Sequence, residues 1–146
     1  MLKKSGTEAP GCLKNKPMNV IEEFKQLSRA AKDACEKFGT ATDCEPYFLS
    51  TLKYVKMHPD EWPEFKHLFV SMAIDPAVGP WELIAFCMRE LRWPEVLEVV
   101  QFQLRVSQDF RVKEVMAKIA AVYANEWEDG DLYHYYSPNQ TRSDLD

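Results

Sequence analysis

The sequence lacks the short motifs that identify common enzyme and metal-binding classes. It has five glycines and three histidines in 146 residues. It contains no glycine-rich phosphate loop, no Gly-x-Ser-x-Gly, no His-Glu-x-x-His and no EF-hand loop. These absences exclude the nucleotide-binding, serine-hydrolase, zinc-protease and calcium-binding classes that those motifs define.

Closely spaced cysteine pairs are also missing. The four cysteines are Cys12, Cys35, Cys44 and Cys87, and no two are spaced as Cys-x-x-Cys. Neither a zinc knuckle nor a thioredoxin-type pair is therefore indicated. Cys35 and Cys87 fall on apolar faces of expected helices, where a free thiol behaves as a small hydrophobic side chain. We expect reduced cysteines and no bound cofactor.

Long apolar runs are absent as well. No stretch approaches the roughly 18 uninterrupted apolar residues that a membrane-spanning helix needs. The N-terminal lysines are not followed by the apolar core of a signal peptide. The sequence therefore predicts a protein without a membrane segment, and we expect it in the cytoplasm.

Positive charge is scarce and unevenly distributed. The formal net charge is −5 at pH 7, which disfavours nucleic-acid binding because an acidic chain repels the phosphate backbone. Residues 1–18 are net basic, whereas residues 126–146 hold six carboxylates against Arg142 alone. Such an acidic end suits a basic protein partner, although most acidic tails only keep a protein solvated.

The most organised feature that is present is a pair of near-copies. The tripeptide Trp-Pro-Glu occurs at 62–64 and again at 93–95, 31 residues later, and apolar residues at helical spacing follow each copy. A residue before proline resists the α conformation. We therefore expect Trp93 to leave helical geometry and to fill the angle between two helices, and Trp62 to do the same in the first copy.

Apolar periodicity predicts an all-α protein of about six antiparallel helices. The expected helices span about 20–38, 44–57, 61–74, 80–92 and 94–106, with a sixth that begins after Ser107 and closes at Asp129-Gly130. Residues 1–18 are expected to form a disordered leader, 19–130 a single helical domain, and 131–146 an aromatic and then polar, acidic tail. Asn19 and Gly39 suit the two ends of the first helix, and Asp43 and Ser107 the starts of the second and sixth.

The repeated helix pairs resemble short helical-repeat proteins of the HEAT or armadillo type. The Trp-Pro-Glu copies lie 31 residues apart, and the preceding Pro-aromatic pairs at 46–47 and 80–81 lie 34 apart, which is near the length of such repeats. The resemblance covers about residues 43–107. It implies a short stack, like a right-handed superhelix, capped by the first and last helices. An irregular helical bundle is the alternative.

An aromatic, acidic segment near the C-terminus is the predicted partner-binding site. It contains Trp127, Asp129, Asp131, Tyr133, Tyr135 and Tyr136. Amphipathic rings flanked by carboxylates are typical of a surface that binds a basic protein. The alternation of tyrosines could instead mark a strand-like tail packed on the body. The other tryptophans, Trp62, Trp81 and Trp93, are expected in the core.

Three functions remain open from the sequence. The first is a non-catalytic protein-interaction module, either an inhibitor or immunity-type protein or an adaptor, with a basic protein partner. The second is a metal-binding protein or enzyme that uses His58, Glu64 and His67, because Glu-x-x-His is a spacing used in di-iron bundles, although a second such motif is missing. The third is a structural subunit that assembles with its own copies.

Overall fold

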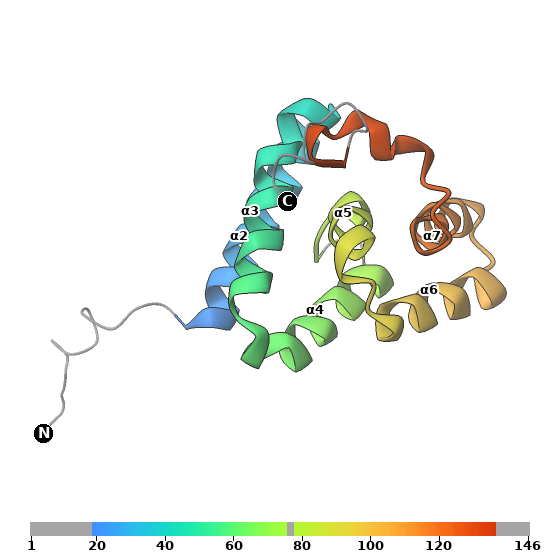
Figure 1. The fold of residues 1–146 in the computed structure, drawn as a ribbon. Coiled ribbons are helices and arrows are strands. Elements are labelled where there is room, and N and C mark those ends of the chain that lie inside the picture. The colour runs from blue at the N-terminus through green and yellow to red at the C-terminus, as the bar shows by residue number, and fades with distance from the viewer. Residues whose placement is uncertain (1–18, 76–77, 137–146) are drawn as a thin grey trace, which may run out of the picture.

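The computed structural model describes residues 19–75 and 78–136, and these form helices and no strand. The α-helices are α2 (Val20–Lys37), α3 (Ala41–Met57), α4 (Trp62–Ile74), α5 (Trp81–Leu91), α6 (Pro94–Val106) and α7 (Phe110–Tyr123) (Figure 1). Short 3-10 helices are η1 (Pro59–Glu61), η2 (Glu128–Leu132) and η3 (His134–Tyr136). The predicted all-α class is confirmed. The expected leader, 1–18, and the polar end of the tail, 137–146, lie outside the described residues.

The ends of α2 follow the prediction. The Asn19 side-chain oxygen accepts hydrogen bonds from the backbone N–H groups of Ile21, at 2.8 Å, and Glu22, at 3.4 Å. Such a cap satisfies N–H groups that have no partner within the helix. Gly39 follows the helix with a φ of +78°, a left-handed conformation in which a residue without a Cβ meets no clash.

Two predicted N-caps are wrong. Thr40 caps α3, because its Oγ1 accepts from the Asp43 N–H at 3.2 Å and donates to the Asp43 carboxylate at 2.9 Å. Asp43 therefore lies in the first turn, where the helix dipole favours a carboxylate. Asp109 caps α7 by accepting from the Arg111 N–H at 2.8 Å. Ser107, the predicted cap, instead follows the last residue of α6.

Helix α7 also ends earlier than predicted, at Tyr123 instead of 129–130. Asn125 adopts a φ of +60°, and the Glu126 N–H reaches back to the Ala121 carbonyl oxygen at 2.9 Å. This is the Schellman pattern, which Asn forms in place of Gly because its short side chain tolerates the left-handed region.

The two Trp-Pro-Glu copies differ in their backbone. Trp93 has φ −69° and ψ 121°, so it is extended before Pro94 and turns the chain as predicted. Trp62 has φ −56° and ψ −39°, so the prediction for the first copy is wrong. The 3-10 helix η1 runs directly into α4, and the bend falls one turn earlier, at His58 before Pro59.

The helices pack in adjacent pairs. α2 packs along α3 and α6 along α7, while α4 contacts α6 and α5 contacts α7. Figure 1 shows α2 and α3 running side by side. Within residues 19–75 and 78–136, no helix is long and apolar enough to cross a membrane.

A single apolar core runs through these helices. Five phenylalanines, Phe24, Phe48, Phe65, Phe69 and Phe86, are fully buried. Each removes an aromatic side chain from water, which stabilises the fold by about 1.5–3 kcal/mol relative to an exposed ring. Trp93 is buried, and Trp62 and Trp81 are half-buried against the core, close to the core placement predicted for all three.

Residues 127–136, here called the C-terminal segment, return from α7 past α5 to α3 (Figure 1). The Glu45 carboxylate on α3 accepts from the backbone N–H groups of His134, at 2.8 Å, and Tyr135, at 2.7 Å. The Tyr135 hydroxyl donates to the Glu90 carboxylate at 2.7 Å, and the Tyr136 hydroxyl to a backbone carbonyl of α5 at 2.5 Å. The segment is therefore fixed on the body in two 3-10 turns, with no strand.

Candidate functional site

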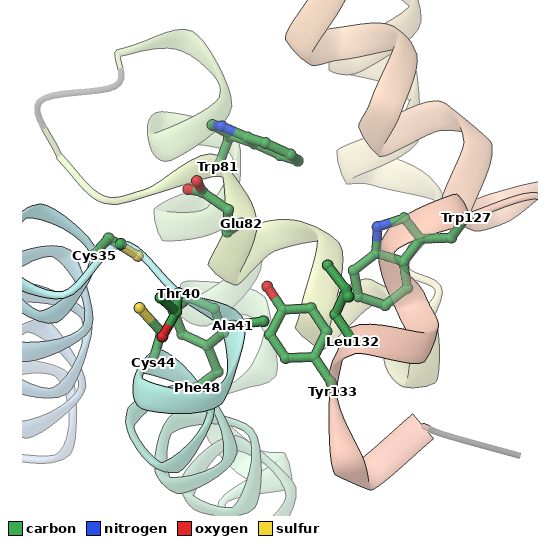
Figure 2. Close-up of a pocket in the computed structure, with 11 residues that line it drawn as sticks. Cys35, Thr40, Ala41, Cys44, Phe48, Trp81, Glu82, Trp127, Leu132 and Tyr133 are labelled. Carbon is green, nitrogen blue, oxygen red and sulfur yellow. The ribbon is translucent and has the colours of Figure 1, made fainter. Parts of the chain in front are cut away.

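A cavity of about 180 Å³ lies beneath the C-terminal segment. Its walls come from three parts of the chain that are far apart in sequence, namely the joint between α2 and α3, the start of α5, and the stretch from Trp127 to Tyr133 (Figure 2). The polar groups of its lining residues are one carboxylate, two thiols, two indole N–H groups and the hydroxyls of Thr40 and Tyr133. We call it the C-terminal cavity.

Glu82 supplies the carboxylate. It lies in the first turn of α5 and is half-buried. Burial raises the pKa of the Glu82 carboxyl above its ordinary value, while its own backbone N–H and the charge of Lys118 oppose the rise. Burial dominates because a charge loses more from desolvation than these two partners return. A cation placed in the cavity would offset this cost.

Trp127 forms another wall of the cavity. Its indole Nε1 is buried and donates to no atom among the described residues. The ring stacks on Tyr133 with centroids 5.5 Å apart and lies over Gly130, where an added Cβ would be 3.1 Å from the indole Cε3. A buried donor left unpaired costs about 1–3 kcal/mol.

Trp81 lies beside Glu82, and a cation already lies over its ring. The ammonium nitrogen of Lys118, on α7, is 5.5 Å from the centroid of the Trp81 ring. The face of an indole attracts a cation through its quadrupole. Figure 2 shows Trp81 and Glu82 next to each other at the start of α5, with Trp127 on the other side of the pocket.

The Cys35 thiol of the cavity is a poor nucleophile. Cys44 is buried, and burial raises the pKa of the half-buried Cys35 thiol, with smaller contributions from the Glu82 carboxylate and from Cys44. A thiol that stays protonated at neutral pH is unreactive, because the thiolate is the attacking species. Burial also raises the pKa of Cys87, which lies in the core as predicted. These three cysteines form no disulfide.

The residues predicted to bind a partner occupy different positions. Trp127 and Tyr133 line the cavity, and Tyr133 is only 5% exposed. Tyr135 and Tyr136 pack their rings on Phe86 of α5, with centroid distances of 6.0 Å and 4.9 Å. Asp131 is exposed. Asp129 lies within η2, and its side chain is outside the described part of the structure.

Other lining residues were not anticipated. Glu82 has the sequence position of a solvated first-turn carboxylate, but it is half-buried beside Trp81. Cys35 and Cys44 come from the two sides of the α2–α3 joint, and nothing in their spacing indicates a shared cavity. These residues meet Trp127 only through tertiary packing, so no local pattern could have grouped them.

The residues of the metal hypothesis do not converge. The His58 Nδ1 lies 2.8 Å from the Tyr54 carbonyl oxygen, and its ring packs on Tyr54 at 4.3 Å between centroids. Glu64 and His67 are exposed on α4. Among the described residues, no group of three or more His, Cys, Asp or Glu side chains is placed to hold a metal ion.

Comparison with known proteins adds no relative. The chain matches no protein-family model, no curated protein and no solved structure.

Proposed function

We propose that this chain is a non-catalytic protein-interaction module of the cytoplasm, an inhibitor or immunity-type protein or an adaptor, and that it binds a basic protein. The single observation that carries the proposal is the C-terminal segment. It is acidic and aromatic, it is fixed on the body by Glu45 and Glu90, and it covers a cavity that contains Glu82. An ordered surface of this composition loses little entropy on binding, which favours recognition.

The negative charge of the chain supports the proposal that its partner is a basic protein. The chain has a formal net charge of −5, and Asp131 is exposed on the segment that covers the half-buried Glu82. Complementary potentials speed association and select against acidic proteins. The described cysteines are unpaired, as is usual in a reducing compartment.

Affinity capture with matched charge variants tests the proposal. Wild-type chain should retain one stoichiometric, salt-sensitive protein from a lysate of the source organism. Asp131→Lys should weaken the Kd of that purified protein at least about tenfold, whereas Glu64→Lys, the same charge change on an exposed residue of α4, should leave it unchanged. Equal weakening by both variants, or no stoichiometric partner, would overturn the proposal.

Point variants are preferable to truncation, because a truncated chain would lose core contacts together with the proposed binding surface. Removing residues 130–136 would uncover Phe48 and Phe86, whose rings pack on Tyr133 at 5.9 Å and 5.1 Å between centroids. Loss of binding by a truncated chain would then report partial unfolding as readily as a missing contact.

We also propose, at the level of architecture, that the helix pairs form a short stack of the HEAT type. Contacts between successive pairs recur at nearly constant sequence separation. They join Gln103 to Ala73 and Tyr123 to Trp93 across 30 residues, and Lys66 to Glu95 across 29. Each pair in a stack contacts only its neighbours. Inserting a second copy of residues 78–109 should therefore give a longer folded monomer, whereas a closed bundle would misfold.

Self-assembly is a second candidate, favoured by an exposed apolar surface at the ends of α4 and α6 and the start of α7. Its large side chains are Ile74, Phe102, Val106 and Phe110. Glu98 and Arg105 line the same hollow as Ile74 and Phe102, so a two-fold contact between copies would pair opposite charges. Sedimentation equilibrium should then show a dimer that Phe102→Glu dissociates, and a monomer at all concentrations would exclude this candidate.

A further inference from the structure

The C-terminal cavity has requirements that restrict its ligand. Glu82 places a carboxylate among aromatic rings, and burial raises its pKa although the charge of Lys118 opposes the rise. Trp127 places a buried N–H that lacks an acceptor among the described residues. A complementary ligand therefore carries both a positive charge and an acceptor oxygen.

The small volume of the C-terminal cavity favours a single amino-acid side chain over a small metabolite as its ligand. The cavity holds about 180 Å³, below the range of about 300–1,000 Å³ that is usual for small-molecule pockets. An anion is disfavoured because the charged lining residue is Glu82, and a metal ion because no group of three ligating side chains is placed to hold one in the described part of the chain.

We propose that the C-terminal cavity receives the side chain of a lysine or arginine carried on a partner polypeptide, with the cation against Glu82 and Trp81 and a carbonyl oxygen of the same polypeptide accepting from the Trp127 Nε1–H. A peptide supplies both groups on one residue, which neither a free amine nor a carboxylate does. This inference rests on the proposed function and specifies its contact.

Lys118 shows that this wall attracts a cation. Its ammonium nitrogen lies over the Trp81 ring at 5.5 Å from the centroid, and its charge acts on Glu82. Lys118 is itself exposed, so water solvates it and it neutralises Glu82 only in part. A ligand cation inside the cavity shares the same wall, and replacing Lys118 by Met should therefore strengthen ligand binding.

Nuclear magnetic resonance with defined peptides tests the proposal. The probes are acetylated and amidated pentapeptides, Ala-Gly-X-Gly-Ala, in which X is lysine, arginine, norleucine or acetyl-lysine. The full chain is labelled with ¹⁵N, and the indole cross-peak of Trp127 is assigned by its disappearance in Trp127→Phe. The lysine and arginine peptides should move this cross-peak saturably. The norleucine and acetyl-lysine peptides should bind at least about tenfold more weakly.

Matched variants of the chain complete the test. Glu82→Gln, a nearly isosteric change, should weaken binding of the lysine peptide at least about tenfold, while Glu64→Gln, an equal charge change in the first turn of α4, should not alter it. Lys118→Met should tighten binding about two- to fivefold. Thermal unfolding of each variant confirms that it is folded.

The outcomes separate this inference from the proposed function. Equal binding of the lysine and norleucine peptides, or a Trp127 cross-peak that does not move, would overturn the cavity assignment. If a captured partner protein binds wild type and Glu82→Gln equally, the interaction module stands and the cavity assignment falls. If the peptides bind as expected and no partner protein exists, the proposed function falls instead.

Discussion

Two regions rich in tryptophan differ in how completely their polar groups are paired. At the corner between α4 and α6, Trp62 and Trp93 contact each other at 5.2 Å between ring centroids, and the Trp62 indole N–H donates to the Val55 carbonyl oxygen at 2.8 Å. In the C-terminal cavity, the Trp127 indole is stacked on Tyr133, but its N–H has no acceptor among the described residues.

The difference distinguishes structural residues from candidate binding residues. Buried donors in native proteins are nearly always paired, so a side chain that breaks this rule calls for an explanation such as a ligand. The corner obeys the rule, and its tryptophans are accounted for by packing alone. Among the described residues, the Trp127 N–H departs from the rule, in a cavity that also contains a half-buried carboxylate.

Truncating Trp93, at the corner between α4 and α6, should reduce stability more than any other substitution considered. Trp93 is 4% exposed and its ring contacts those of Trp62 and Phe69. Trp93→Ala should lower the free energy of unfolding by about 3–5 kcal/mol, since it leaves a large cavity in the core. Trp127→Ala removes a half-buried ring and should cost about 1–2 kcal/mol. Urea denaturation measures both values, and equal losses would contradict the distinction between the two regions.

Truncating the tyrosines of the C-terminal segment should give the second largest loss of stability. Tyr135→Ala combined with Tyr136→Ala removes two rings from Phe86 and the hydroxyl contacts to Glu90 and to the α5 backbone. The expected loss is about 2–4 kcal/mol of unfolding free energy, seen as a lower thermal midpoint. An unchanged midpoint would mean that the segment is not fixed on the body.

The same contrast explains what could be predicted from the sequence. Signals at Asn19, Gly39 and Pro94 act within one turn of the residues that they affect, so the helices near them were predicted closely. Thr40 and Asp43 are three residues apart and bond to each other, so either could have been the cap, and only the observed geometry distinguishes them.

The cavity could not be predicted because its parts meet only in three dimensions. Trp127 and Tyr133 stood out as aromatic residues in an acidic segment, and both do line the cavity. Glu82 follows Trp81 at a helix start and has the position of a solvated first-turn carboxylate. It shares the cavity with a segment about 50 residues later in the chain, and no periodicity within α5 encodes that relation.

Conservative ring replacements should separate paired from unpaired indoles. Trp62→Phe leaves the Val55 carbonyl oxygen without its donor and should lower the free energy of unfolding by about 1 kcal/mol or more. Trp127→Phe removes a donor that has no partner among the described residues, and relief of that desolvation cost offsets the lost ring area, so it should destabilise the fold less than Trp62→Phe does. Urea denaturation of the two variants side by side gives the comparison, and a larger loss for Trp127→Phe would reveal a missing hydrogen-bond partner.

The smallest expected effect is a pair of opposite pH dependences at two first-turn carboxylates. Burial raises the pKa of Glu82 above its ordinary value of 4.5, whereas hydrogen bonding to its own backbone N–H and to Lys66 lowers that of Glu95. The folded state thus holds the Glu82 proton more firmly than the unfolded state, and this contribution to stability falls as pH rises through the folded pKa. For Glu95 the contribution is present above 4.5 and is lost as pH falls through the lowered pKa.

Glutamine variants measure these slopes directly. Glu82→Gln should be as stable as wild type near pH 4 and more stable at pH 7, by less than about 1 kcal/mol because solvent screens a half-exposed group. Glu95→Gln should become less stable than wild type over the same rise in pH. Urea denaturation at the two pH values gives both differences. If Glu82→Gln instead lost stability as pH rose, Glu82 would already have a strong cationic partner, and the cavity would have no need of one from outside.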